Sequence, residues 1–334
     1  MTRILALLSL IALSALAFPC VAIAATATEA RGSVSAAYPV RPVRIIVGNP
    51  AGSGTDMLAR FVGGKLTERV GQQIVVDNRP GAYGIIGAEF TARAAPDGHT
   101  LMFMSTSHTM NAAAYSKLPF DPVKSFTPVM RLSAGPLVLV THPAFAANSV
   151  KGLVDLATAK PNTITYAVSG TGGINHFAGA MFARSAGVQL LNVPYKGGPP
   201  ALTDVMGGQV QLMFATLAIT QSHVRAGRLK ALGVSTVKRT ALLPEVPTIA
   251  ESGAPGYEIS IWWGVLGPAG MPSTIVARLN GEIAGILSQP ESAKRLEADG
   301  AVPSPLPSAE FERALVSEIE KWKRVAREAN IKFE

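Results

Sequence analysis

A glycine-rich loop, residues 48–54, carries the first pattern in this sequence that fits ligand chemistry. It follows a β-rich apolar run at 43–47 and precedes a predicted helix that opens at Thr55 and Asp56. The first turn of a helix has backbone N–H groups without helical acceptors, and the helix dipole makes that end partly positive. Glycine also lets a ligand approach the backbone, because it has no Cβ. The loop therefore predicts an anion site, whose candidate ligand-binding residues are Ala51, Gly52, Ser53, Gly54, Thr55 and Asp56.

Two further loops of this kind follow strands later in the chain, with the sequences SGTGGINH at 169–176 and PYKGGP at 194–199. Ligands of open α/β sheets bind at the carboxyl ends of the strands, so glycine-rich loops in two α/β units predict two halves of one cleft. The hydroxyls of Ser169 and Thr171 can donate hydrogen bonds there. The candidates in this half are Ser169, Thr171, Gly172, Gly173, His176, Tyr195 and Lys196, and Ser107 completes the set in the first half.

Three of these candidates also have an ordinary structural interpretation. Asp56 is favoured as a helix cap over a ligand contact, because it sits near the first turn. His176 falls one turn into a predicted helix, where a packing role is the commoner one. Lys196 fits a solvated surface charge as well as it fits a ligand contact.

The arrangements that catalysis or metal binding requires are missing from the sequence. A serine-hydrolase elbow needs Gly-x-Ser-x-Gly, and Ala51 stands where its first glycine belongs. The loop 48–54 lacks the Lys-Ser/Thr ending of a phosphate-binding loop. The five histidines show no His-x-x-x-His spacing. We therefore expect a binding protein and not an enzyme, with no catalytic residue, no metal site and no cofactor.

Hydrophobic patterning predicts two tandem α/β units that position these loops. The first has strands at 43–47, 74–76 and 100–104 and helices at 55–66 and 85–94, a βαβαβ order typical of a parallel sheet. The second has strands at 136–141, 163–168, 190–193, 210–214 and 229–234 and helices at 150–159, 175–186, 199–206 and 220–226. A strand at 259–266 and helices at 273–287, 292–299 and 308–330 follow. The apolar stripe of the last helix, which we expect to pack in the core, is Phe311, Leu315, Ile319, Trp322 and Ala326.

The amino terminus predicts export. Arg3, the apolar stretch 4–18 and the sequence AIA at 22–24 form a secretory signal peptide, residues 1–24, with cleavage after residue 24. A membrane anchor is the weaker alternative, because the stretch is too short to span a bilayer comfortably. Cys20, the only cysteine, would leave with the signal, so the mature protein would have no disulfide. We expect a periplasmic location.

The charge excludes one class of partner. The formal net charge is +8, but the basic residues are scattered and do not interleave with aromatic residues. Nucleic-acid binding is therefore not expected. A positive field favours anionic ligands modestly, although solubility alone explains the charge equally well.

In their order along the chain, the motifs resemble the tripartite tricarboxylate transporter receptors, also called Bug-type solute-binding proteins. The resemblance covers essentially the whole mature chain. It is carried by YPVRPVRIIV at 38–47, PAGSGTD at 50–56, NRPGA at 78–82, PDGHTL at 96–101, KLPFD at 117–121, PYKG at 194–197, LPEVPT at 243–248 and GPAGMP at 267–272.

This resemblance implies a type II periplasmic-binding-protein fold, in which two α/β lobes are joined by two crossover strands. The first lobe would contain residues 38–138 and 257–334, the second would contain 139–256, and the ligand cleft would lie between them. Similar proteins bind carboxylates through backbone N–H groups of two loops and through water, and they deliver the ligand to a membrane permease. We therefore expect a monomer that binds a small dicarboxylate, tricarboxylate or aromatic acid.

The expected capture mechanism uses neutral donors. The motif loops contain no arginine, so we expect the carboxylate to meet backbone N–H groups around 52–55 and, opposite them, around Ser169, Thr171 and Gly172. Trp262 and Trp263, just past the second proposed crossover, are expected to report lobe closure, and Trp322 to be silent.

The sequence departs from the family pattern at four positions, one of which, Met271 in place of a common Thr, is expected to be neutral, and it leaves one alternative open. Tyr83 and Ile85 stand where many relatives have Gly and Asn, and Ala215 stands where many have Asp. If position 215 reaches the cleft, the missing acid argues against an amino-acid ligand. A sensory protein that binds the same ligand but docks onto a signalling receptor is the alternative to a transport receptor.

Overall fold

The computed structural model describes residues 38–170, 172–298, 300–328 and 331, so the predicted signal peptide and Thr171 lie outside the described residues. In chain order, its elements are β1 (Val43–Val47), α2 (Gly54–Val70), β2 (Ile74–Asn78), the 3₁₀ turn η1 (Ala82–Gly84), α3 (Ile85–Ala92), β3 (Thr100–Ser105), α4 (Ser107–Ala114), β4 (Phe126–Thr141), α5 (Val150–Ala159), β5 (Thr165–Val168), α6 (Ile174–Ser185), β6 (Leu191–Pro194), α7 (Gly198–Met206), β7 (Leu212–Thr216), α8 (Leu217–Arg225), β8 (Lys230–Val234), β9 (Ser260–Pro268), α9 (Ser273–Leu287), α10 (Pro290–Ala298), β10 (Val302–Pro307) and α11 (Ser308–Glu328).

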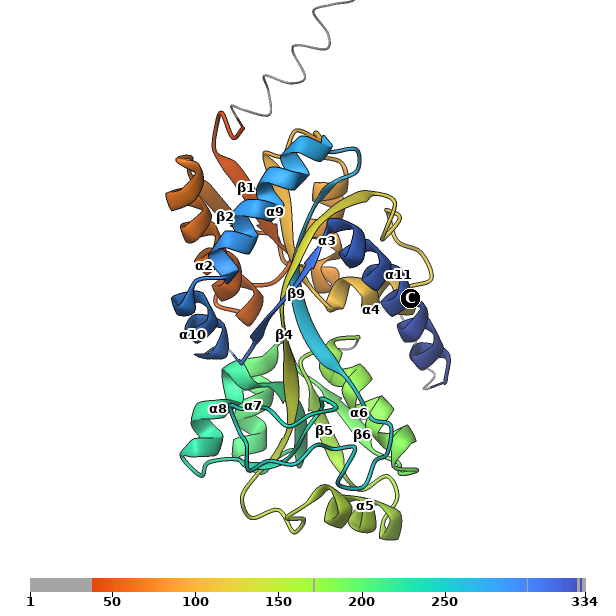
Figure 1. Ribbon diagram of the computed structural model, residues 1–334. Helices are drawn as coiled ribbons and strands as arrows, with labels where there is room; N and C mark the ends of the chain where they lie inside the picture. Colours follow the sequence, from red (N-terminus) through yellow and green to blue (C-terminus); the bar gives the residue numbers. More distant parts are fainter. Residues whose placement is uncertain (1–37, 171, 299, 329–330, 332–334) are drawn as a thin grey trace, which may run out of the picture. The chain divides into compact units, whose positions relative to one another are not determined.

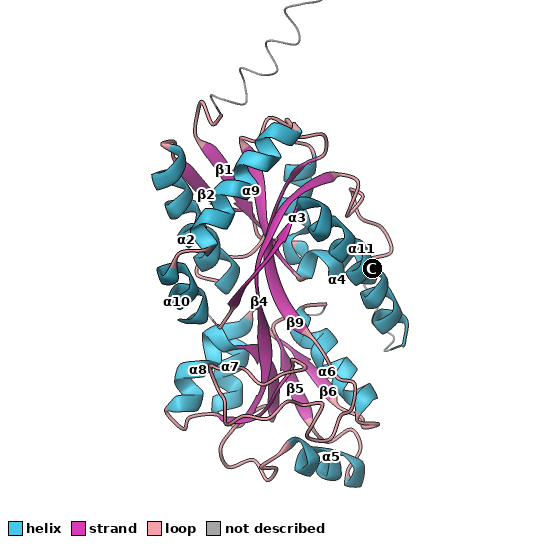
Figure 2. Cartoon of the chain, in the orientation of Figure 1, coloured by secondary structure: helices cyan, strands magenta, loops and turns pink. Residues whose placement is uncertain are grey.

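The first lobe is built on a mixed sheet. Strands β2, β1 and β3 are parallel neighbours, which confirms the predicted βαβαβ unit. Strand β9 pairs with β3 antiparallel, and β4 pairs with β9 in the same sense. Helices α2 and α10 lie on one side of these strands, and α4 and α11 lie on the other (Figures 1 and 2). The carboxyl ends of β1 and β3 therefore meet at one edge, where α2 and α4 begin.

The second lobe repeats the layered plan. Its strands β5, β6 and β7 are parallel, while β4 pairs antiparallel with β7 and β8. The 16-residue strand β4 thus belongs to both lobes. The chain returns through β9, which pairs with β4 from Ser260 onward, and just before it the N–H of Ile259 donates to the carbonyl of Ser235, next to β8, at 3.0 Å. The fold is therefore the expected one of two α/β lobes joined by two crossover strands, although the predicted lobe boundaries stay a prediction.

Three elements differ from the sequence-based expectation. Strand β4 begins ten residues before the predicted 136–141, because β9 and β10 pair along a stretch that carries Pro128 and Gly135. Helix α4 and strand β10 were not predicted at all. Strand β10 has prolines at 303, 305 and 307, and it tolerates them because it pairs only with β4. The other elements begin and end within a few residues of their predicted limits.

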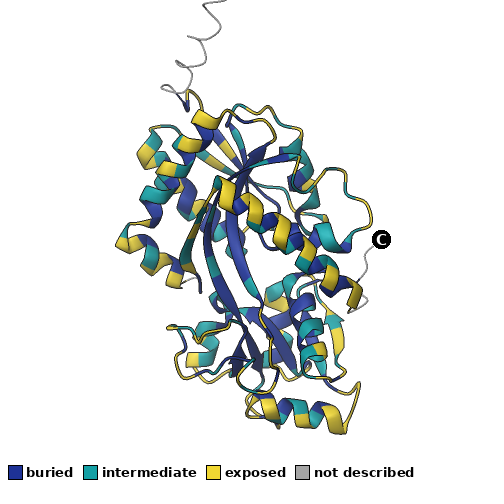
Figure 3. Cartoon of the chain, turned by 45° about the vertical axis from the view of Figure 1, so that its right-hand side comes forward, coloured by how far each residue is buried: buried dark blue, intermediate teal, exposed yellow. Residues whose placement is uncertain are grey.

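The core consists of several apolar clusters packed against the strands. Most strands are buried along much of their length (Figure 3), while β2, β6 and β10 are more exposed. The predicted stripe of the last helix is buried as expected, from Phe311 to Ala326. Near its end the ring of Trp322 packs 5.6 Å from that of Phe177 on α6. Helix α11 therefore contacts the second lobe, and the ring of Trp322 lies at this contact. None of the helices in the described part of the chain combines the length and apolar character needed to cross a membrane.

Candidate functional site

The amino-terminal end of α2 presents two available backbone donors. Ser53 is the N-cap, and its Oγ accepts the N–H of Asp56 at 3.3 Å. The N–H of Gly52 donates to the carboxylate of Asp56 at 2.8 Å. The backbone N–H groups of Gly54 and Thr55 have no acceptor among the residues that the structure describes. The donors available to an anion here are therefore those of Gly54 and Thr55, whereas that of Gly52, in the same predicted stretch 52–55, is occupied.

Asp56 braces this loop from inside. Its side chain is 3% exposed and also accepts hydrogen bonds from Arg60 Nε at 3.1 Å and from Asn78 Nδ2 at 2.8 Å. Burial alone would raise the pKa of Asp56, but the hydrogen bonds from Arg60, Gly52 and Asn78 outweigh it and lower the pKa. Asp56 is therefore an ionised residue in the first turn of α2 that accepts the backbone N–H of Gly52, while Ser53 is the N-cap. This geometry supports the capping interpretation over a ligand contact.

Thr55 adds a hydroxyl donor to the same place. Its Oγ1 accepts the indole N–H of Trp263 at 3.2 Å, and the residue is 6% exposed. An indole nitrogen only donates, so Thr55 must be the acceptor in this bond and keeps its own proton. Trp263 pairs with Ser105 in the sheet, and the hydroxyls of Ser105 and Ser107 lie 3.1 Å apart. The predicted residue Ser107 thus lies at the same sheet edge as Thr55.

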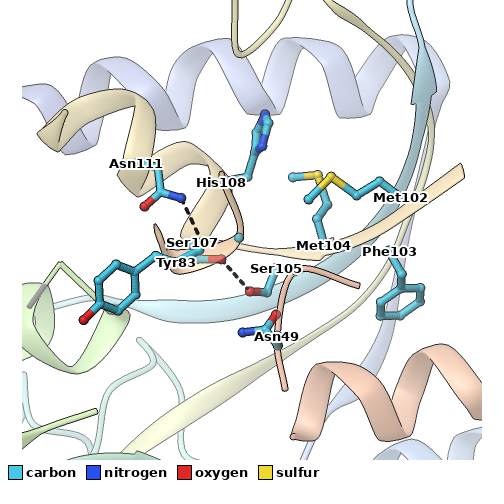
Figure 4. A pocket seen from close by; sticks show the side chains of 11 residues that line it. Asn49, Tyr83, Met102, Phe103, Met104, Ser105, Ser107, His108 and Asn111 are labelled. Atoms are coloured by element: carbon cyan, nitrogen blue, oxygen red, sulfur yellow. Dashed lines mark hydrogen bonds between the residues drawn. The ribbon is translucent and has the colours of Figure 1, made fainter. Parts of the chain in front are cut away.

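A small pocket opens beside these serines, between β3, α4 and the turn η1 (Figure 4). Its volume is about 10 Å³, room for roughly one water molecule. The side chains around it include Asn49, Tyr83, Ser105, Ser107, His108 and Asn111. Figure 4 shows Asn111 reaching the backbone of Tyr83 and Ser107 reaching Ser105. The pocket is too small for an organic ligand, so the wall formed by its lining residues can contact only part of one.

His108 belongs to this wall as a neutral group. Burial lowers the pKa of His108, against a smaller opposing effect of its hydrogen bond to the carbonyl of Pro122. Because a carbonyl only accepts, Nε2 carries the proton in that 2.8 Å bond. The ring also stacks on Phe120, with centroids 6.0 Å apart. His108 therefore supports α4 and contributes no charge to the site.

In the second lobe, Ser169 is oriented by a residue that sequence reasoning did not select. The side-chain amide of Asn175 donates to the carbonyl of Phe214 on β7, which fixes which end of the amide is nitrogen. The amide oxygen is then the acceptor for Ser169 Oγ, at 2.5 Å. The proton of Ser169 is used in this bond, so Ser169 offers only lone pairs to a ligand. The expected donor is therefore an acceptor.

The glycine-rich loop itself is held by His176. The N–H of Gly172 donates to His176 Nδ1 at 3.2 Å, and the N–H of Gly173 donates to the carbonyl of Gly170 at 3.2 Å. Burial lowers the pKa of His176, which keeps the imidazole neutral and able to accept at Nδ1. Of the predicted residues in this loop, Ser169, Gly172, Gly173 and His176 are brought together, and Thr171 is outside the described residues.

The third loop adjoins the second. The N–H groups of Tyr195 and Gly197 donate to the carbonyls of Val168 and Ser169, at 2.9 and 3.1 Å. The hydroxyl of Tyr195 donates to Asp204 at 2.7 Å, and burial together with this carboxylate raises the pKa of Tyr195 to about 12. Tyr195 is thereby tied to α7. Lys196, beside Ser169, is exposed and forms no ion pair within the described residues.

The two lobes meet at Tyr83. A Cβ added to Gly170 would clash with the hydroxyl of Tyr83, so the η1 turn of the first lobe contacts the second lobe's glycine-rich loop. The sequence showed Tyr83 only as a departure from a family pattern.

Ala215, another departure, is fully buried in the apolar core of the second lobe. No group of three His, Cys, Asp or Glu side chains that could hold a metal occurs in the described ranges.

Comparisons with known proteins place this geometry in context. Residues 58–331 match the family described as tripartite tricarboxylate transporter family receptor. A protein from the tcbD-tcbE intergenic region of Pseudomonas sp. strain P51 is 37% identical over 309 residues, 91% of each chain. Protein BugT of Bordetella pertussis is 33% identical over 298 residues, which cover 89% of this chain and 91% of that one.

Solved structures agree with this likeness. R. palustris Rpa4515 with adipate superposes with a TM-score of 0.83 at 35% identity, over 88% of this chain and 99% of that one. MatC from Rhodopseudomonas palustris with bound malate gives a TM-score of 0.77 at 30% identity, over 86% and 99%. The periplasmic binding protein BugD gives 0.80 at 31% identity, over 89% of this chain and all of that one.

Proposed function

The chain belongs to the tripartite tricarboxylate transporter receptor family, and we propose that it is a periplasmic receptor that captures a small dicarboxylate between its two lobes. This membership confirms the resemblance drawn from the motifs. The relatives are binding proteins, so the chain is a binding protein and not an enzyme.

The main observation behind the proposal is the set of hydrogen-bond donors at the start of α2. The N–H groups of Gly54 and Thr55 and the hydroxyl proton of Thr55 converge on one helix terminus. A carboxylate has only acceptor atoms, so it matches three donors at the positive end of a helix dipole. The first carboxylate of the ligand would bind there, without an arginine clamp. Two solved relatives support this chemistry, since one was determined with adipate and the other with malate.

The second lobe favours a second polar end on the ligand. Lys196 offers an exposed positive charge next to the loop that carries Ser169. Ser169 offers an acceptor, which suits a hydroxyl or a bridging water more than a carboxylate oxygen. We therefore favour a dicarboxylate over a monocarboxylate. Ala215 is no obstacle to this assignment, because a small apolar residue in the core presents no charge to the ligand.

Export, delivery and assembly are parts of the same proposal. A cleaved signal peptide at residues 1–24 would place the mature protein in the periplasm, as a monomer. There it would deliver its ligand to the membrane permease subunits of a tripartite tricarboxylate-type transporter. Membership of a receptor family supports this role.

Titration calorimetry in carboxylate-free buffer tests the ligand class. The probes are succinate, malate, adipate, citrate, benzoate and glutamate, with putrescine as a cationic control. We expect at least one dicarboxylate to bind, and Thr55→Val to weaken that binding by about tenfold, the loss of one hydrogen bond to a charged group. The matched variant Thr55→Ser keeps the hydroxyl and should bind like the parent.

Two outcomes would contradict the proposal. If the parent binds none of the acids, the ligand class is wrong. If a dicarboxylate binds equally well to Thr55→Val and to the parent, the carboxylate is not held at the start of α2.

A further inference from the structure

The turn that carries Tyr83 is strained. Ala82 and Tyr83 have φ angles of 42° and 55°, so two consecutive residues with side chains occupy the left-handed region. Such residues rarely adopt it, because Cβ approaches the backbone. The buried side chain of Asn111 on α4 holds the turn by donating to the carbonyl of Tyr83 at 3.0 Å. Strained turns that their surroundings hold in place cluster at ligand sites, where they aim a side chain.

Here the aimed side chain is the phenol ring. Figure 4 shows the ring pointing away from Met102 and Phe103, with its hydroxyl outermost. That hydroxyl lies against Gly170, whose φ of 144° and lack of Cβ make room for it. No hydrogen-bond partner for the hydroxyl occurs among the residues that the structure describes. Burial and the neighbouring Tyr115 raise the pKa of Tyr83, so the phenol keeps its proton at neutral pH.

The ring stands between a loop of the first lobe and the glycine-rich loop of the second lobe. On one side lie Gly48 and Asn49, which belong to the loop ahead of α2 and line the same pocket as Tyr83. On the other side lies Gly170, directly after Ser169 and within hydrogen-bond distance of Gly173. With the ring in place, the enclosed space next to it holds about 10 Å³. A glycine at position 83 would remove the ring and open that space toward Gly170.

We propose that Tyr83 is the residue that sets the length of the ligand, by filling the space between the two loops and by donating its hydroxyl to the ligand's distal polar group. This inference rests on the proposed dicarboxylate function. Its consequence is a preference for shorter diacids than a receptor with glycine at this position would show. The same ring contacts the second lobe, so a ligand of fitting length is closed in by Tyr83 and the loop around Gly170.

The test is an affinity profile against unbranched diacids from malonate to suberate, measured by titration calorimetry on four proteins. They are the parent, Tyr83→Gly, Tyr83→Phe and Ala82→Gly. Ala82→Gly is the matched control, because it relieves the same kind of strain in the same turn but leaves the ring in place. Thermal unfolding of each variant verifies that it is folded; glycine suits the backbone at both positions.

We expect the best-bound diacid to become longer by at least one methylene group in Tyr83→Gly and to stay the same in Ala82→Gly. Tyr83→Phe should keep the preferred length and bind it about two- to tenfold more weakly, the effect of one hydrogen bond. An unchanged length preference in Tyr83→Gly overturns the inference about Tyr83 and leaves the proposed function standing. Failure of the parent to bind any diacid overturns the proposed function and this inference with it.

Discussion

Replacing Asp56 tests whether the loop before α2 is braced from inside. Asp56→Ala removes an acceptor that receives three hydrogen bonds, from Gly52, Arg60 and Asn78. A hydrogen bond to a charged group contributes about 1.5–3 kcal/mol. Gly52 and Arg60 are exposed, so these two donors regain water in the variant. We therefore expect the free energy of unfolding to fall by about 2–4 kcal/mol, which lowers the Tm by roughly 3–6 °C in a chain of this size.

Chemical denaturation of the parent, Asp56→Ala and Asp155→Ala measures this effect. Asp155 is the matched control, because it also pairs with a basic residue four positions away, Lys151, but on an exposed surface. Its removal should change the free energy of unfolding by no more than about 0.5 kcal/mol. A loss of stability in Asp56→Ala that equals the loss in Asp155→Ala would refute the bracing role.

The pH dependence gives a second check on the same variant. The pKa of Asp56 is lower in the folded protein than in the unfolded chain, so its ionised form is favoured by folding. Its contribution is complete above the unfolded pKa, near 3.9, and is lost as the pH falls through the lower folded pKa. The stability difference between parent and Asp56→Ala should therefore be constant at neutral pH and shrink below about pH 4. A difference that persists at low pH would mean that the charge of Asp56 contributes nothing.

Three further predictions follow from individual contacts. Gly48→Ala should destabilise the protein and displace the 82–84 turn, because its Cβ would lie 2.6 Å from the backbone of Gly84. Gly64→Ala, on the open face of α2, should instead raise the free energy of unfolding by up to about 1 kcal/mol. Urea denaturation of the two variants and the parent measures both effects. Burial raises the pKa of Glu318, despite hydrogen bonds from neighbouring side chains. The free energy of unfolding should therefore decline as the pH rises from the ordinary carboxylate pKa to the raised one. Glu318→Gln should remove that decline, which a pH series of thermal melts measures. Ligand binding should change the fluorescence of Trp322, since its ring contacts the second lobe. If the ligand-induced fluorescence change of the parent persists unaltered in Trp322→Phe, Trp322 is silent, as the sequence suggested.

Much of the scaffold could be predicted from the sequence alone, because it depends on local patterns. Apolar periodicity located α5 and α9 at their observed limits and most strands within a few residues. The glycine-rich loops were recognisable because a helix start and a missing Cβ are local properties. The ordered motifs also sufficed to identify the family, which the match over residues 58–331 confirms.

Elements that depend on distant partners were missed. Strand β10 carries three prolines, and only its position beside β4 makes it a strand. The first half of β4 likewise exists because β9 pairs with it across more than a hundred residues of chain. Propensity is a local quantity, so it contains no information about such a neighbour.

Hydrogen-bond direction at the candidate site was decided entirely by the tertiary structure. From sequence, Gly52, Gly172 and Ser169 all looked like donors to a ligand. In the folded protein, the N–H of Gly52 donates to Asp56 and the N–H of Gly172 donates to His176. The amide of Asn175 donates to the carbonyl of Phe214, which turns its oxygen toward Ser169, so the Ser169 hydroxyl can only accept from a ligand. Thr55 keeps its proton only because Trp263, 208 positions away, donates to it. A side chain's type states what bonds it can form, but the partners that folding brings to it determine which of those bonds remain for a ligand.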